Sequence, residues 1–275
     1  MKKINLVVAG VLAVSASHLF AQTAAPAAEP AAAAAPAATP DWTITGNMAL
    51  SSDYRTRGVS QTDKGPALSG GFDLAHSSGF YIGNWNSNID STYFNGANLE
   101  MDIWAGFRGT VGDVGYDIGA FYYYYPGSGS GGAGSGLPGI DQKEIYVGAS
   151  YGPVSARVYI PIGDFFSAEN IWNEGSADGS YYVDVSGSQS VGDGYTLIAH
   201  VGYQKLKGSA KYGFQETDGN LPDDYVDWKL GGSYTFSTGH VVSLVYIDTS
   251  IKARAYASSR IVTGATGVLS VSKTF

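Results

Sequence analysis

Residues 98–108 read N-L-E-M-D-I-W-A-G-F-R, and apolar and polar side chains alternate along this run. Leu99, Met101 and Ile103 share one parity, whereas Glu100 and Asp102 share the other. A period of two is typical of a β-strand, whose successive side chains point to opposite faces. The run exceeds the usual globular strand of about five or six residues and matches the roughly 9–11 residues of a tilted bilayer-spanning strand. Taken alone, it fits the edge of a soluble sandwich equally well.

The same alternation recurs from residue 41 onward. It predicts strands at 42–54, 67–75, 80–89, 98–108, 116–125, 142–151, 154–160, 181–188, 195–204, 226–236, 241–248 and 264–275. In the third of these, Asn84, Asn86 and Asn88 stand opposite Tyr81, Trp85 and Ile89, so we expect the asparagines to face the polar side. The strand at 241–248 is apolar on both faces, and its parity stays open.

The connections between these strands alternate in length. Short turns are expected at 76–79, 109–114, 152–153, 189–194 and 237–240, and long ones at 55–65, 90–97, 126–141, 161–180, 205–225 and 249–263. Short turns on one side and long loops on the other are typical of an outer-membrane barrel. The chain is therefore predicted to be all-β, a transmembrane antiparallel up-and-down β-barrel of about 12 strands, with both ends of the barrel on the short-turn side.

Aromatic residues gather near both ends of the predicted strands, as expected of rings in two headgroup zones. Those near the long loops are Tyr54, Tyr124, Tyr181, Tyr203, Trp228 and Tyr246, and those near the short turns are Trp42, Phe107, Tyr116, Tyr151, Tyr195, Tyr234 and Phe236. The alternative is that aromatics are merely good strand formers. The terminal Phe275 is similar to the C-terminal insertion signal of outer-membrane proteins, although Lys273 departs from the apolar residue usual two places earlier.

The first forty residues predict secretion. Lys2 and Lys3 precede the apolar run 4–16 and a zone of small residues, which is the pattern of a signal peptide. We assign residues 1–21 to the signal, with cleavage between 21 and 25 left open, and residues 22–40, rich in Ala and Pro, to a disordered periplasmic linker. Residues 41–275 form the barrel. A retained anchor is the alternative, but the apolar run is too short to span a bilayer.

Composition narrows the function classes. Charged residues make up 15% of the chain, and it contains no cysteine, so disulfides and thiolate metal sites are excluded. Removal of Lys2 and Lys3 with the signal takes the net charge from −8 to −10, which argues against nucleic-acid binding. No metal-ligand spacing or nucleotide motif occurs, so no cofactor is expected.

Several motifs resemble those of the TorF family of proteobacterial outer-membrane porins, long described only as conserved hypothetical proteins. They are S-S-D-Y-R-T-R-G-V-S-Q-T-D at 51–63, G-F-Y-I-G-N-W-N-S-N-I-D at 79–90, N-L-E-M-D-I-W-A-G-F at 98–107, Y-D-I-G-A-F-Y-Y-Y-Y-P-G at 116–127 and E-I-Y-V-G-A-S-Y-G at 144–152. The resemblance covers essentially the whole mature chain. It implies an outer-membrane barrel with pore activity, and it brings no functional residues with it.

If the apolar parity faces lipid, the other parity lines the lumen. The pore-lining candidates are Asp73, Glu100, Asp102, Arg108, Asp117, Glu144, Arg157, Asp184, His200, Asp227 and Lys229, and the pore-mouth candidates in the first long loop are Arg55 and Arg57. An excess of acids over bases predicts an acidic wall that favours cations. The alternative is that these charges pair with neighbours and only hold the barrel shape. The Gly- and Ser-rich connection 126–141 is expected to be an external loop, with an inward constriction as the alternative.

These features predict a channel for passive diffusion of small polar solutes or ions in the outer membrane of a Gram-negative bacterium. Its expected partners are lipid, lipopolysaccharide, the outer-membrane assembly machinery and the solutes, and its oligomeric state is left open. The alternative is a closed barrel with a structural or adhesive role through its loops. An enzyme is not expected, because His200 is the only histidine in the predicted wall and Ser186 or Ser233 is its best nearby partner.

Overall fold

The computed structural model of the chain describes residues 41–129, 136–253 and 261–275. The predicted signal peptide and the Ala/Pro-rich linker lie outside the described residues, and both stay predictions. The strands and helical turns are β1 (Trp42–Ser51), β2 (Arg55–Thr56), β3 (Val59–Ser60), β4 (Ala67–His76), β5 (Phe80–Asn88), β6 (Leu99–Val111), β7 (Val114–Tyr124), β8 (Gln142–Tyr151), β9 (Val154–Ile162), η2 (Phe165–Ser167), α1 (Ala168–Trp172), β10 (Tyr181–Gly192), β11 (Tyr195–Lys205), η3 (Gly208–Phe214), β12 (Asp224–Thr235), β13 (His240–Thr249) and β14 (Thr266–Thr274).

Twelve of these strands form one closed antiparallel barrel, as the alternating pattern predicts. Each strand pairs with its neighbours in the chain, and β1 pairs with both β4 and β14, which closes the sheet. At the closing seam, Phe275 N–H donates to the Gly46 carbonyl at 2.8 Å and Gly46 N–H donates to the Phe275 carbonyl at 3.2 Å. The short β2 and β3 form a separate two-stranded sheet inside the first long connection.

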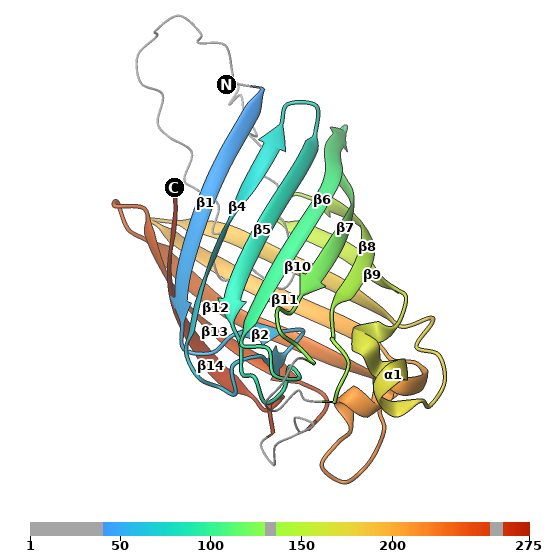
Figure 1. The fold of residues 1–275 in the computed structure, drawn as a ribbon. Helices are drawn as coiled ribbons and strands as arrows, with labels where there is room; N and C mark the ends of the chain where they lie inside the picture. Colours follow the sequence, from blue (N-terminus) through green and yellow to red (C-terminus); the bar gives the residue numbers. More distant parts are fainter. Residues whose placement is uncertain (1–40, 130–135, 254–260) are drawn as a thin grey trace, which may run out of the picture.

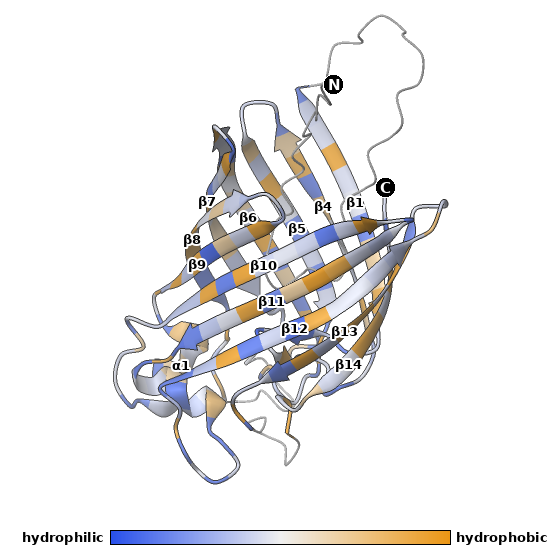
Figure 2. Cartoon of the chain, turned by 180° about the vertical axis from the view of Figure 1, so that it is seen from behind, coloured by the Kyte–Doolittle hydropathy of each residue, from blue (hydrophilic) through white to orange (hydrophobic). Residues whose placement is uncertain are grey.

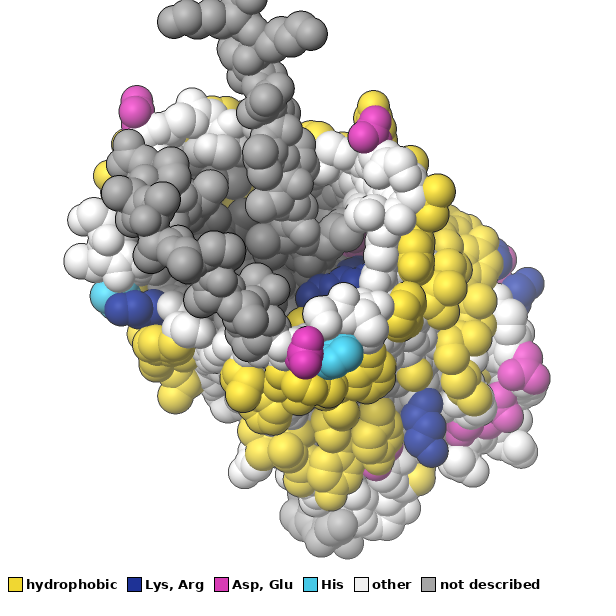
Figure 3. Space-filling view, turned by 90° about the horizontal axis from the view of Figure 1, so that it is seen from above, with side chains coloured by type: hydrophobic (Ala, Val, Ile, Leu, Met, Phe, Trp, Pro, Cys, Tyr) yellow, Lys and Arg dark blue, Asp and Glu magenta, His cyan; other side chains and the backbone are white. Residues whose placement is uncertain are grey.

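Apolar side chains cover the outside of the barrel. Along β13 and β14, Leu244, Tyr246 and Leu269 are about half exposed, whereas Ser243 and Ser270 point inward and are buried. The hydropathy colours of the wall strands alternate accordingly (Figure 2). Seen from the end that carries the termini, hydrophobic side chains form the outer wall and basic side chains are visible inside the mouth (Figure 3). No helix among the described residues is long and apolar enough to cross a membrane.

Short and long connections lie at opposite ends of the barrel. The described ends of the chain and the short turns share one end, and α1, β2 and the long connections share the other (Figure 1). The outward aromatic residues at the strand ends follow the predicted distribution, with one exception. Tyr54 is 2% exposed, because β1 ends at Ser51 and the following residues turn into the barrel.

The parity expected for β5 is wrong. Tyr81, Trp85 and Ile89 are buried inside the barrel, while Asn84 and Asn86 lie on the outer face. The asparagine amides satisfy their own hydrogen bonds there: Asn86 Nδ2 donates to Asn84 Oδ1 at 2.7 Å, and Asn84 Nδ2 donates to the Asp102 carbonyl at 3.0 Å. Because a paired polar group costs much less in an apolar environment than an unpaired one, the large rings can take the inner positions.

We predict that Leu244→Arg lowers the unfolding free energy of the barrel by about 2–4 kcal/mol, because it places a charge near the middle of the apolar belt. Equilibrium denaturation in lipid vesicles measures the loss. Ser237→Arg is the matched control, because Ser237 is exposed in the short turn between β12 and β13, where the same charge costs about 0–1 kcal/mol. Equal losses for the two variants would contradict the assignment of the outer face.

Candidate functional site

A row of charged side chains crosses the inner wall of the barrel. The strand register joins Arg108 to Asp117, then through Gly148 to Arg157 and Asp184, and then through Gly202 to Asp227. We call these five charged residues and the two glycines the charged row. Because the pairing is continuous from β6 to β12, basic and acidic groups follow one another around half of the interior. Such a row in a bore would interact with any charged solute that enters.

Most members of the charged row are paired. Arg157 forms an ion pair with Asp117, and the guanidinium of Arg108 lies 4.9 Å from the centre of the Tyr81 ring. Tyr81 and Tyr146 also bond to each other through their hydroxyl groups, and Tyr81 donates to Asp117. The alternative expectation, that the wall charges pair with neighbours, therefore describes this layer well.

His200 lies between two carboxylates of the charged row. Its Nδ1 is 2.9 Å from Asp184 Oδ2 and its Nε2 is 2.9 Å from Asp227 Oδ1. Ser186 Oγ lies 3.0 Å from Nδ1, and the Tyr182 hydroxyl donates to Asp227 Oδ2 at 2.9 Å. A serine, a histidine and an aspartate thus meet here, as in hydrolase triads. Ser186 Oγ, however, donates its proton to Asp184 Oδ1 at 2.8 Å, so the hydroxyl is directed at a carboxylate and not at the imidazole.

Glycines on the inner face make room for the large side chains of neighbouring strands. A Cβ added at Gly202 would collide with the Tyr182 hydroxyl, one at Gly119 with the Tyr146 hydroxyl, and one at Gly83 with the Trp104 ring. The rings therefore lie against the wall, over the neighbouring glycine, instead of projecting straight across the bore. This arrangement fits a barrel whose narrow interior must hold many aromatic residues.

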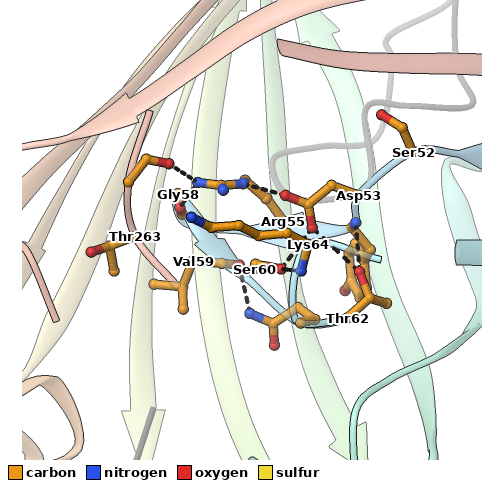
Figure 4. Close-up of polar contacts among 12 residues, drawn as sticks. Ser52, Asp53, Arg55, Gly58, Val59, Ser60, Thr62, Lys64 and Thr263 are labelled. Atoms are coloured by element: carbon orange, nitrogen blue, oxygen red, sulfur yellow. Dashed lines mark hydrogen bonds and ion pairs between the residues drawn. The ribbon is translucent and has the colours of Figure 1, made fainter. Parts of the chain in front are cut away.

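The first long connection folds into the barrel as a hairpin, the inward hairpin (residues 52–66). Its two strands, β2 and β3, are joined by Arg57 and Gly58, whose φ angles of 49° and 78° form the tight turn that suits a two-residue hairpin. A Cβ at Gly58 would approach the Asp227 Cβ to 2.7 Å, so the tip of the hairpin touches the wall at β12. Figure 4 shows the hairpin residues within the ring of wall strands.

Two arginines fix the inward hairpin. Arg55 Nε is 2.7 Å from Asp53 Oδ2 within the hairpin (Figure 4). Arg55 Nη1 donates to the Gly264 carbonyl at 2.8 Å. Arg57 Nη2 is 2.6 Å from Glu144 Oε2 on β8, and Arg57 Nη1 donates to Gln204 Oε1 on β11 at 2.9 Å. The hairpin is thus tied to β8, to β11 and to the connection that precedes β14.

Arg57 is charged although it is buried. Burial by itself lowers the pKa of its guanidinium, but the Glu144 carboxylate more than offsets this effect, and the pKa lies well above its usual value. The guanidinium also lies 4.4 Å from the centre of the Tyr182 ring, so an aromatic face contributes to its stabilisation. Arg57 is therefore a permanent cation inside the barrel, at the tip of the hairpin.

The structure places nearly all predicted site residues inside the barrel. Those buried in the interior are Glu100, Asp102, Asp117, Glu144, Arg157, Asp184, His200, Asp227 and Lys229. Asp73 and Arg108 are partly buried on the same inner parity. Arg55 and Arg57 were expected at the pore mouth, and this prediction is wrong. Both are buried with the inward hairpin, where they add positive charge to the interior.

Several interior residues were not predicted from the sequence. Tyr182, Tyr123 and Gln204 contact Arg57 or the charged row, but the pore-lining candidates were limited to charged residues and His200. The signal that could have found Tyr182 is a mid-strand glycine of inner parity, Gly202, on the adjacent strand. The connection 126–141, expected to be an external loop with an inward constriction as the alternative, lies partly outside the described residues, and in its described part the Pro138 carbonyl accepts a hydrogen bond from Asn95 Nδ2 at 3.1 Å. No cluster that could hold a metal ion occurs among the described residues.

Solved porin structures have a similar barrel. The NanC porin matches with a TM-score of 0.51 at 6% identity, covering 85% of this chain and 99% of that chain. The KdgM porin in complex with disordered oligogalacturonate matches with a TM-score of 0.49 at 8% identity, covering 84% of this chain and 98% of that one. At such identities the likeness to NanC shows the fold alone. None of the curated proteins matches the sequence.

We predict that Gly202→Ala destabilises the barrel by about 1–3 kcal/mol, because the added methyl group collides with Tyr182 and overpacks the wall. Chemical denaturation of the refolded protein measures the effect. Gly267→Ala, on β14, is the matched control, because no other atom lies within 4 Å of the point that its added Cβ would occupy. A neutral Gly202→Ala variant would show that Tyr182 does not depend on this glycine for its place.

The sequence also matches a family as a whole. Residues 34–275 match the family described as "Bacterial protein of unknown function (Gcw_chp)", so the chain belongs to this family. The match covers every described strand. The more specific resemblance to the TorF family stays a prediction.

Proposed function

We propose that this member of the Gcw_chp family is an outer-membrane channel for small polar solutes, in which the inward hairpin forms the constriction. The observation that carries the proposal is the charged row on the inner wall together with the hairpin that meets it. Charged groups inside a closed barrel with an apolar outer surface favour a water-containing interior. The porin-like fold also supports the proposed channel.

The position of the hairpin supports its role as the constriction. Twelve strands enclose a bore between that of barrels with about eight strands, which side chains fill, and that of 16–18-stranded porins, which leave an aqueous channel. In a bore of this size, a hairpin tied to β8 and β11 through Arg57 narrows the path. Solutes must therefore be small, or the hairpin must move.

A closed barrel is the second candidate, and the aromatic half of the interior favours it. Trp85, Trp104, Phe121 and Tyr146 all point inward from β5 to β8 and are buried. If these rings and the inward hairpin together fill the bore, the protein serves structure or adhesion through its long loops. Conductance separates the two functions directly.

We predict that the reconstituted protein forms ion-conducting steps in planar bilayers and that Arg57→Ala enlarges them. The substitution removes the ion pair with Glu144 and the bond to Gln204, which together tie the hairpin across the bore. Removal of one partner from a buried pair leaves the other charge uncompensated, which further loosens the hairpin. Single-channel recording measures both steps.

Lys252→Ala is the matched control, because Lys252 is exposed in the last long connection. Its conductance should equal that of the wild type. Protein that never conducts, with or without Arg57, would reject the channel and leave the closed barrel. Conducting protein whose steps do not respond to Arg57→Ala would reject the hairpin as its constriction.

We also propose a weak preference for cations. The interior acids outnumber the bases, but Arg55 and Arg57 reduce the excess and several acids are paired. Glu100 and Asp102 lie on β6, where Glu100 accepts a hydrogen bond from the Tyr54 hydroxyl of the hairpin at 2.9 Å. We predict that the double variant Glu100→Gln, Asp102→Asn moves the reversal potential in a KCl gradient toward zero. Asp178→Asn, in an exposed loop, should leave it unchanged. An anion-selective wild type would contradict this preference.

A further inference from the structure

A cavity of about 210 Å³ lies between the inward hairpin and the long connections, at the end of the barrel that carries those connections. Arg57 and Gln204 line the cavity on the side of the hairpin. Other parts of the lining come from η2, α1 and η3 and from the barrel strands β7 and β12. The cavity is smaller than the roughly 300–1,000 Å³ of pockets for drug-sized ligands. Its size therefore suits a molecule with a single ring.

Two aromatic groups face this cavity. On one side, Phe94 stacks on Tyr125 with ring centres 5.2 Å apart and planes within 15°, and Phe166 packs against Tyr125. On the other side, Phe214 packs on Tyr225 with ring centres 5.2 Å apart. Phe166 belongs to the surroundings of both clusters, so the cavity lies between them. Walls of this kind favour a flat aromatic ring.

Two hydrogen-bond donors that belong to residues lining the cavity have no partner among the described residues. The Tyr225 hydroxyl is one, in a residue that is 1% exposed, and Nε of Arg57 is the other, in a residue that is 9% exposed. A buried donor without a partner costs free energy, and such donors are usually satisfied by a bound group or by water. Arg57 Nε can only donate, and the Tyr225 hydroxyl can donate as well as accept, so an acceptor oxygen on a ligand matches both.

The charge of the ligand follows from Arg57. Its guanidinium is matched by Glu144 at 2.6 Å, and the neighbouring acids Glu100 and Asp102 are buried on the adjacent wall. The cavity thus offers no net positive charge to an anion. We propose that it is a binding site for a small, uncharged aromatic molecule that carries a carbonyl or similar acceptor group.

The test uses benzamide as the probe and isothermal titration of the refolded, full-length protein in detergent. We expect saturable binding of one benzamide per barrel, with weaker binding of cyclohexanecarboxamide, which lacks the aromatic ring, and of benzoate, which carries a charge. The measurement does not depend on conduction, so its result is separate from that of the proposed channel. Absence of saturable benzamide binding, or tighter binding of benzoate, would overturn the proposal.

Two variants locate the site. Tyr225→Phe removes one hydroxyl and should weaken benzamide binding by roughly two- to tenfold, the effect of one hydrogen bond. Tyr246→Phe, on the outer face, is its control and should have no effect. Ala210→Leu adds bulk to the buried lining and should abolish binding, whereas Ala149→Leu on the outer face should not. Heat-dependent gel mobility confirms that each variant is folded, and unchanged binding in folded Ala210→Leu would place benzamide elsewhere.

Discussion

Closure of the sheet between β1 and β14 is the constraint on which the rest of the structure depends. In the hydrocarbon region no water satisfies a free backbone group, so a sheet spans a membrane only when it has no edge. Here the seam pairs Asn47 with Thr274 and Ser51 with Ser270, and the terminal Phe275 exchanges hydrogen bonds with Gly46. Once the sheet is closed, each strand has one apolar face toward the outside and one face toward a confined interior. The strict alternation along the chain is the consequence.

The confined interior explains both the glycines and the position of the hairpin. Large inward rings fit only where the neighbouring strand has no side chain, as at Gly119 and Gly202. Where β10 to β14 carry small residues such as Ser186, Ser243 and Ser270, the wall leaves more space. The inward hairpin reaches this side of the barrel, where its turn glycine, Gly58, lies against β12 and β13. Shape complementarity thus decides where the loop enters.

Strand positions, closure and the alternation of loop lengths could be predicted from sequence, because each depends on local periodicity and on turn residues. The fold of the first long loop could not, because its partners Glu144 and Gln204 are about 90 and 150 residues away and a single sequence carries no record of that proximity. The inner face of β5 was misjudged for a similar reason. The Tyr81 ring depends on Gly106 of the next strand, and hydrogen bonding of the outward asparagines lowers their cost. Polarity alone therefore gave the wrong face.

The ion pair between Arg57 and Glu144 specifies the position of the hairpin more than it stabilises the barrel. Both partners lose hydration on burial, and the attraction between them returns about as much free energy as that loss costs. Loss of one partner is far more costly, because the other charge then stays buried without compensation. A cation that reaches the hairpin would compete with Arg57 for Glu144. In the proposed channel, passage of ions and displacement of the hairpin would be physically coupled, because the hairpin is held in the bore by the same charges that attract the solute.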